Sequence, residues 1–405
     1  MILAVLLLLN STFAANCTSI KTYKEFYKCT LEKHPEFEVA KLKIQEAEAV
    51  IDKASQWQNP NLDVKSISGK LAGENIGSTE LSLSIPLSQI WTRGAQMDAG
   101  RADKKIADIE AQLSLLSVKK QLIKDIFRLR QVNDEIELNS EALGAYDKIK
   151  NQFKARLARG PEQEITFNLV ELATSDYELK KNHLTTERTE ILARIKGIWG
   201  AGFDIKKEYL PPPKEKWPEL PKEINIGQSF ESRKVMAESD KASAEYNLAV
   251  RESWPEVSAG PTVERSTEGP VQYTSSGFNL SISVPILSWN GGGRNLAETK
   301  AKQSRLLSEY AHRKAQIERE IVIHKYRSAV ESLKKSSARE DVRKKHTRID
   351  SLFRQGLASG GLIIEAHRQI TEYTESQHEH EVSAIEAYLD IKALTGDENI
   401  EELLQ

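Results

Sequence analysis

The chain has 405 residues, and its 57 lysine and arginine residues nearly balance 59 aspartate and glutamate residues, which gives a formal net charge of −2. The two signs are interleaved, as on solvated helix faces, so the sequence predicts no surface for binding nucleic acid. The mean hydropathy is −0.49. Beyond the first residues no segment is apolar enough to cross a bilayer as a helix.

The first fifteen residues predict a secretory signal peptide. Residues 2–9 are all apolar, and small residues follow up to Ala15, where cleavage is plausible. The apolar run is far shorter than the ~20 residues that a membrane-spanning helix needs. We therefore expect residues 1–15 to be removed on export.

Two cysteines, Cys17 and Cys29, follow the signal. In an oxidising compartment they could close a short disulfide loop, or they could remain unpaired thiols. Lipidation of Cys17 is a third alternative, but Asn16 stands where a small residue is expected. The sequence leaves these alternatives open.

The region 16–209 predicts a helix, a strand hairpin and a long helical hairpin. The first helix covers residues 22–57, and alternating polar and apolar residues then predict a hairpin over residues 61–86. Residues 94–199 predict two long helices separated by a break at Gly160-Pro161. A helix of about 60 residues would extend about 90 Å, which no globular core needs.

The rest of the chain repeats this order after a stiff linker. Residues 210–228 contain five prolines. The second repeat, residues 229–395, predicts a helix, a hairpin over 256–285 and a long helical hairpin over 294–395, and residues 396–405 form a tail. Residues 353–360 also align with 153–160 at the helix breaks, so a repeat of roughly 200 residues indicates a duplicated half-protein.

The duplication is clearest in two strands. Residues 81–87 read Leu-Ser-Leu-Ser-Ile-Pro-Leu and residues 280–286 read Leu-Ser-Ile-Ser-Val-Pro-Ile. Such alternation fits barrel strands with serines towards a wet lumen, although a small soluble sandwich is an alternative. Four strands cannot close a barrel alone, so closure would need copies of the chain. The residues expected to face lipid are Leu81, Leu83, Ile85, Leu280, Ile282 and Val284.

Over roughly residues 25–395 the chain resembles the TolC family of outer-membrane efflux proteins. The resemblance rests on Gln58-Asn59-Pro60, on the two Leu-Ser-x-Ser-x-Pro strands, on the helix starts after them and on the break at 353–359 followed by Leu362-Ile-Ile-Glu-Ala366. It implies an α+β membrane protein in the bacterial outer membrane that extends into the periplasm. Three copies would form a twelve-stranded β-barrel, four strands per chain, that continues into a long α-helical coiled-coil barrel.

The resemblance also implies a function and partners. Such proteins are passive exit ducts that dock on a periplasmic adaptor (membrane fusion) protein and an inner-membrane pump of RND or ABC type. It implies no enzymatic activity, cofactor or metal. The alternatives are a type I protein secretion duct and, from a different class, a periplasmic coiled-coil scaffold, which would not need two strand hairpins.

The resemblance assigns roles to the helix tips and to the strand ends. Arg156 stands where the family usually has glycine, and Phe353 and Ala358 replace the polar latch of its best-known member, so no such latch is expected. The adaptor contacts would be Arg156, Leu157, Ala158, Phe353, Gly356, Leu357, Ala358 and Ser359. The acids at the aperture or lumen would be Glu162, Glu164 and Glu365, unless they are merely solvated helix acids. The strand-to-helix turns would lie at Pro86, Gly94, Pro285 and Gly293.

Two motifs are expected to carry no chemistry. Residues 291–294, Gly-Gly-Gly-Arg, lack the Lys-Ser/Thr of a phosphate-binding loop. His378 and His380 point to different sides of a helix and cannot easily share a metal ion. The other histidines at 324, 346 and 367 are scattered along the sequence and predict no structural metal site.

Overall fold

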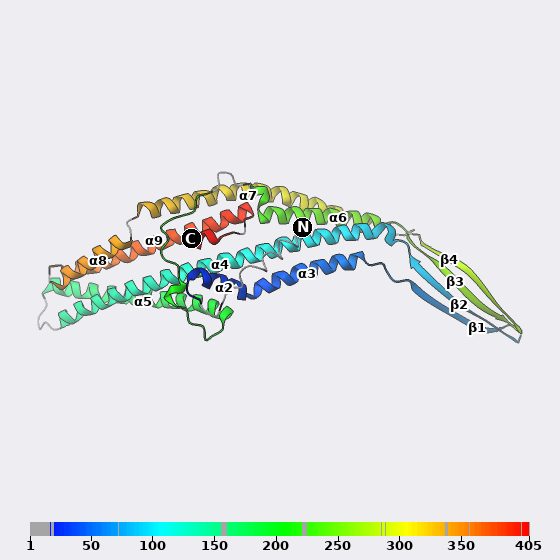
Figure 1. Ribbon diagram of the computed structural model, residues 1–405, viewed down its shortest axis with the longest axis horizontal. Helices are drawn as coiled ribbons and strands as arrows, with labels where there is room; N and C mark the ends of the chain where they lie inside the picture. The colour runs from blue at the N-terminus through cyan, green and yellow to red at the C-terminus, as the bar shows by residue number, and fades with distance from the viewer. Residues whose placement is uncertain are drawn as a thin grey trace. The chain divides into compact units, whose positions relative to one another are not determined.

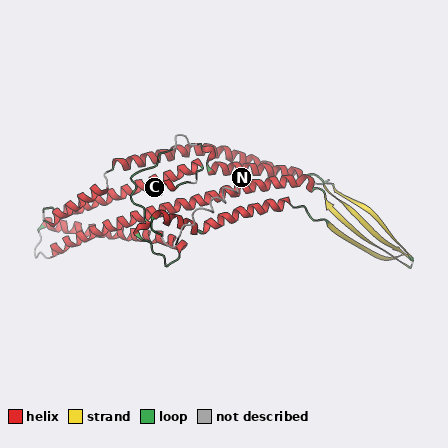
Figure 2. Ribbon diagram, viewed as in Figure 1, coloured by secondary structure: helices red, strands yellow, loops and turns green. Residues whose placement is uncertain are grey.

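A computed structural model of the chain describes residue 17 and residues 20–71, 73–154, 160–220, 225–284, 286–287, 289–336, 339–355, 357–397 and 399–404. The expected signal peptide, residues 1–15, lies outside these residues. Helices dominate, and four strands form one sheet (Figures 1 and 2).

The elements follow one another in two similar series. The helices are α2 (Tyr23–Lys33), α3 (Pro35–Ser55), α4 (Gln89–Lys154), α5 (Pro161–Trp199), α6 (Phe230–Arg251), α7 (Gly291–Lys335), α8 (Arg339–Arg354) and α9 (Gly360–Thr395). The strands are β1 (Asn61–Leu71), β2 (Glu74–Pro86), β3 (Glu256–Glu268) and β4 (Val271–Ser283). Short 3₁₀ helices are η1 (Lys207–Tyr209), η2 (Ile226–Gln228) and η3 (Glu401–Leu404).

Two helices expected to be continuous are divided. The predicted helix over 22–57 is split into α2 and α3 at His34, whose backbone is extended (φ −69°, ψ 127°). The cause is Pro35, because proline disfavours helical backbone in the residue before it and suits the first position of a new helix. The second long hairpin likewise contains two helices, α7 and α8, before its break.

The described residues fall into two compact units that do not follow the two repeats. The helical unit comprises Met1–Val39, Leu113–Ile226 and Gln316–Gln405, and the sheet unit comprises Ala40–Gln112 and Gly227–Ala315. Each unit therefore takes segments from both repeats.

In the sheet unit all neighbouring strands are antiparallel, in the order β1-β2-β3-β4. Within each repeat a turn joins two strands that pair with each other, β1 with β2 and β3 with β4. The β2–β3 pairing joins the two repeats, with Leu81 opposite Val263 and Ile85 opposite Ala259.

In the helical unit an aromatic stack fixes α2. The ring of Phe26 lies 5.4 Å from that of Tyr209 and 6.2 Å from that of Trp199. The Trp199 Nε1–H donates to the Thr30 hydroxyl at 2.8 Å. A disulfide joins Cys17 to Cys29, with the Cα atoms 5.7 Å apart. Of the three alternatives for these cysteines, the structure has the disulfide.

Near the ends of α4, α5 and α9 the helical unit has an ordinary apolar core. Tyr146 and Ile149 of α4 meet Val170 and Tyr177 of α5 and Ile363 of α9, and all five side chains are buried. The rings of Tyr146 and Tyr177 meet edge to face at 5.3 Å. Burial of this kind stabilises a helix by about 1.5–3 kcal/mol per large side chain.

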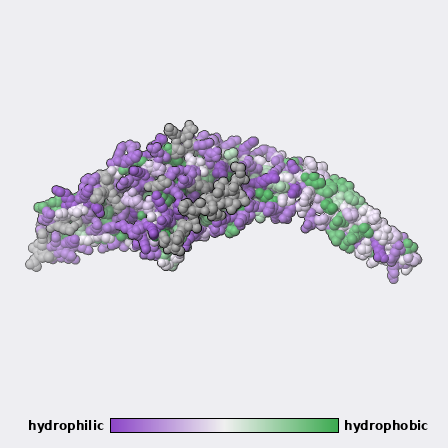
Figure 3. Space-filling model, in the orientation of Figure 1, coloured by the Kyte–Doolittle hydropathy of each residue, from purple (hydrophilic) through white to green (hydrophobic). Residues whose placement is uncertain are grey.

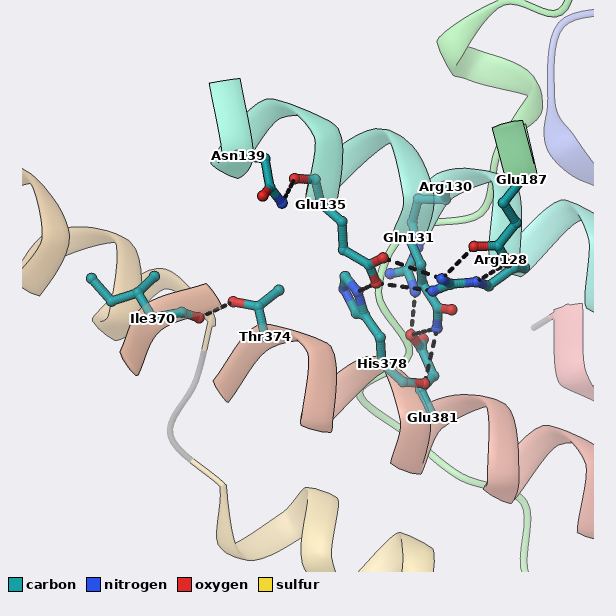
Figure 4. A network of polar contacts seen from close by, with 10 residues as sticks. All are labelled: Arg128, Arg130, Gln131, Glu135, Asn139, Glu187, Ile370, Thr374, His378 and Glu381. Carbon is teal, nitrogen blue, oxygen red and sulfur yellow. Dashed lines mark hydrogen bonds and ion pairs between the residues drawn. The ribbon is translucent and has the colours of Figure 1, made fainter. Parts of the chain in front are cut away.

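Further along the same helices, the interior of the helical unit also contains buried polar and charged side chains. Figure 4 shows side chains of α4, Gln131 and Glu135 among them, directed towards His378 and Glu381 of α9. The Arg128 guanidinium donates to Glu135 at 2.9 Å and to Glu187 of α5 at 2.7 Å. His378 Nδ1 lies 2.6 Å from a Glu135 carboxylate oxygen. Burial raises the pKa of Glu135, but hydrogen bonds from His378 and Arg128 outweigh it, and the pKa lies below its ordinary value.

Glu381 connects three segments of the helical unit. Its carboxylate accepts from Arg130 and, at 2.8 Å, from Gln131 Nε2, both of α4. It also accepts from the backbone N–H of Lys214, in the proline-rich linker, at 3.1 Å. The Arg130 and Glu381 side chains are only 8% and 7% exposed. The register of α9 against α4 therefore depends on this acid.

We expect Glu381→Ala to lower the free energy of unfolding by about 3–5 kcal/mol, because it leaves the buried Arg130 charge without its partner. Glu379→Ala is the matched control, since Glu379 lies on the same helix and is exposed. Urea titration of the detergent-solubilised protein measures both. Equal stability of the two variants would contradict this role of Glu381.

Candidate functional site

One face of the sheet is apolar. Paired residues of adjacent strands point to the same face, and the register places Leu81 of β2 beside Val64 of β1 and Val263 of β3. Leu280 of β4 lies on the same face, opposite Ala259. Figure 3 shows apolar residues gathered on the strands. Side chains here are strongly exposed, with Leu81 at 46% and Leu280 at 57%.

The opposite face is polar. Asp63, Ser82 and Thr262 lie side by side across β1, β2 and β3. Two residues further along β1, on the same face, Lys65 pairs with Glu80 of β2. The Glu80 carboxylate accepts a hydrogen bond from the Thr262 hydroxyl at 3.2 Å. The sheet therefore separates an apolar surface from a charged and hydroxylated one.

Five of the six side chains predicted to face lipid, Leu81, Leu83, Ile85, Leu280 and Ile282, belong to the apolar face. Leu81 pairs with Val64 and Leu83 with Leu62, and Ile282 pairs with Val257 of β3. Ile85 is 42% exposed and Val284, just after β4, is 62% exposed. Contact of these side chains with lipid remains a prediction.

The two outer strands leave the sheet open. Within the described residues no strand pairs with the free edge of β1 or of β4. Each edge strand therefore presents a row of backbone N–H and C=O groups to its surroundings, which is a template for pairing with another chain.

The connections from strand to helix are shorter than predicted, because each helix begins earlier in the sequence. Pro86 ends β2 as expected, but Gly94 lies inside α4, which begins at Gln89. The helix starts early because Ser88 O already accepts the backbone N–H groups of Trp91 and Thr92.

In the second repeat, Gly293 lies inside α7, which begins at Gly291. The turn is made by Asn290, whose φ of 50° is left-handed, and Asn290 O accepts the N–H of Arg294. The predictions that Gly94 and Gly293 are turn residues were wrong. Pro285 lies outside the described residues.

The predicted helix tips are described in part. Arg156, Leu157, Ala158 and Gly356 lie outside the described residues. In the second tip, Leu357 is 72% exposed, Ser359 is exposed and Ala358 is half-buried. The Ser359 hydroxyl caps α9 by accepting the N–H of Leu362 at 3.3 Å.

Phe353 differs from its tip neighbours. It is half-buried and packs against the apolar core that contains Tyr146 and Ile363. A Cβ added at Gly360 would lie 3.3 Å from Thr166 of α5 and 3.4 Å from Ile149 of α4. The start of α9 is therefore held closely against the other helical hairpin.

The predicted acids are not equivalent. Glu164 is exposed near the start of α5, and the side chain of Glu162 lies outside the described residues. Glu365 accepts from Arg368 at 2.7 and 2.9 Å, and this pairing lowers the pKa of Glu365. Arg368 also donates to Glu372 at 2.8 Å. The charge of Glu365 is thus partly compensated within its own helix, by an arginine that it shares with Glu372.

Several polar groups become neighbours only through the fold. His378 is buried beside Glu135, whereas His380 is exposed. His346 and His367, far apart in the sequence, bring their rings together. The buried row Gln131, Glu135, Asn139 has helical spacing, which could have indicated a polar interface but not its partners.

None of the described helices carries an apolar stretch long enough for a membrane crossing.

Comparison with known proteins adds to this geometry. Residues 26–201 match the sequence model of a family described as outer membrane efflux protein. No curated protein sequence matches the chain.

Solved structures resemble the chain over nearly its full length. The outer membrane protein VceC of Vibrio cholerae is 13% identical, over 92% of this chain and 96% of that one, with a TM-score of 0.69. The Campylobacter jejuni CmeC outer membrane channel is 14% identical, over 96% and 89%, with a TM-score of 0.65. The open state of the Neisseria gonorrhoeae MtrE outer membrane channel is 11% identical, over 93% and 89%, with a TM-score of 0.65. The resemblance predicted from the repeated strands is confirmed.

We expect Leu280→Arg, on the apolar face, to destabilise the protein in a bilayer by about 2 kcal/mol, and by up to ~4 at the bilayer midplane. Ser281→Arg is the matched control, because the next residue of the strand belongs to the polar face. Urea titration in lipid vesicles measures both variants. A larger loss for Ser281→Arg would reverse the assignment of the two faces.

Proposed function

We propose that this chain is a member of the TolC family of outer membrane efflux proteins and one of three protomers of a passive exit duct. Members of the family lie in the bacterial outer membrane and extend into the periplasm, and they are channels rather than enzymes. Each protomer supplies four strands to a twelve-stranded barrel. The long helices of the three protomers continue it as an α-helical tunnel.

The open sheet is the observation that carries this proposal. Its apolar face would be exposed to water in a lone chain, whereas hydrocarbon accepts it without loss. Unpaired backbone groups cost several kcal/mol each in hydrocarbon, so the edges of β1 and β4 must be paired there. Pairing β4 of one copy with β1 of the next satisfies both edges and leaves the polar face towards a lumen.

The helix tips are the proposed docking surface for the adaptor. Leu357 is a large apolar side chain at a turn and is 72% exposed. An exposed apolar group of this kind suits a protein partner better than water. Through the adaptor the duct would receive substrates from an inner-membrane pump, of the RND or the ABC type.

The size and conductance of the isolated protein test the duct. We expect outer-membrane fractions extracted in mild detergent to give a trimer by native mass spectrometry, and that trimer to conduct ions in planar bilayers without an energy source. A monomer in the soluble periplasmic fraction would contradict the proposal and favour the scaffold.

Photo-crosslinking tests the docking surface. We expect a photoreactive residue at Leu357 to cross-link to a periplasmic adaptor in intact cells, because the tip side chain is exposed. The matched control is Leu179 of α5, which is 70% exposed but far along its helix from the tip. Equal adaptor capture from both positions would argue against a tip-specific contact.

A further inference from the structure

Two histidines from different helices face one another in the helical unit. His346 lies on α8 and His367 on α9, and their Nε2 atoms are 3.2 Å apart. The rings are perpendicular, with centroids 4.9 Å apart, so they do not stack. They approach one another through their ring nitrogens.

The second ring nitrogen of His367 fixes where the hydrogen of that ring must be. His367 Nδ1 lies 2.9 Å from the carbonyl oxygen of Ile363, which can only accept, so Nδ1 carries the hydrogen. In neutral His367 the Nε2 atom therefore presents a lone pair. His346 Nδ1 lies 3.7 Å from a carboxylate oxygen of Glu141, which is too far for a hydrogen bond. Without a bound metal, His346 can therefore donate from Nε2 to His367 Nε2, and with its hydrogen on Nδ1 it presents a second lone pair instead.

With the hydrogen of His346 on Nδ1, two lone pairs are directed towards one point. Two acceptor nitrogens at 3.2 Å repel each other unless a cation lies between them. When two imidazoles bind one tetrahedral zinc ion through metal–nitrogen bonds of about 2.0–2.1 Å, their two bonded nitrogens lie about 3.3–3.4 Å apart. If the angle between the two bonds is a right angle, the nitrogens lie about 2.9 Å apart. The observed separation falls between these values.

The surroundings hold both rings in place. His367 is 4% exposed, and the buried ring of Tyr146 meets it edge to face at 5.8 Å. The His346 side chain is 12% exposed. Metal-binding histidines commonly donate their other ring N–H to a backbone carbonyl or a carboxylate, which orients the ring. His367 makes such a bond to the carbonyl of Ile363.

We propose that His346 and His367 bind one divalent transition-metal ion, with water in the remaining coordination positions. Imidazole nitrogen suits Cu²⁺, Ni²⁺ and Zn²⁺, with Cu²⁺ bound most tightly. Among the described residues no group of three or more His, Cys, Asp or Glu could hold a metal, so the site has two protein ligands. The disulfide removes Cys17 and Cys29 as competing thiolates.

The metal would act as a clamp between α8 and α9. Both helices lead to the tip that begins α9 at Gly360, and the ion would join them through side chains alone. The site does not depend on the transport function, so its failure would leave the proposed duct untouched.

Copper binding to the full-length, detergent-solubilised protein, free of any histidine tag, tests the site. We expect one tightly bound Cu²⁺ per chain by equilibrium dialysis, with an electron paramagnetic resonance spectrum that shows coupling to imidazole nitrogen. Each of His346→Gln and His367→Gln should weaken binding roughly tenfold or more, because half of the protein ligands are lost. His380→Gln, at an exposed position on α9, should leave binding unchanged.

The spectrum of the unaltered protein guards against variants that misfold. A copper spectrum without imidazole nitrogen coupling would overturn the proposal without reference to any variant. Equal binding in His346→Gln, His367→Gln and the unaltered protein would overturn it too. The absence of bound Cu²⁺, Ni²⁺ and Zn²⁺ on the unaltered protein at neutral pH would overturn it as well.

Discussion

Backbone hydrogen bonding at the two edges of the sheet is the constraint on which the rest of this structure depends. A strand edge in water can bind solvent, but in hydrocarbon it must pair with another strand. The sheet has both an apolar face and two free edges, β1 and β4, within the described residues. A single chain cannot satisfy them, so the proposed assembly follows from the sheet before any helix is considered.

The helical unit meets a different constraint. Its helices are long and charged, and part of their interior is an ionic network around Glu135 and Glu381. A buried ion pair often adds little net stability over apolar packing, but it strongly penalises any register that separates its partners. We therefore regard the network as a device that fixes how α9 lies along α4, while the apolar core around Tyr146 supplies more of the cohesion.

The sequence predicted the strands well because alternation with a period of two is a local property, and the duplication presented it twice. The split at Pro35 was missed, although its signal is local, since proline acts on the residue before it. Which residues of different helices become neighbours could not be predicted from the sequence. Arg130 and Glu381, like His346 and His367, lie on helices whose rotation and register are set by tertiary packing, which helical spacing alone does not determine. Gly94 was misplaced because a helix start depends on a carbonyl, Ser88 O, that sequence does not show.

The strand order has a consequence for assembly. Because β2 pairs with β3, the two repeats are already joined inside each chain. Without the duplication, twice as many separate chains would have to meet to close the same barrel. In a duplicated chain two hairpins are covalently linked, so they meet within one molecule, where each has an effective concentration of about a millimolar around the other. Duplication would thus make closure of the proposed barrel less dependent on the concentration of the protein, and it frees the two tips to diverge while the two hairpins stay alike.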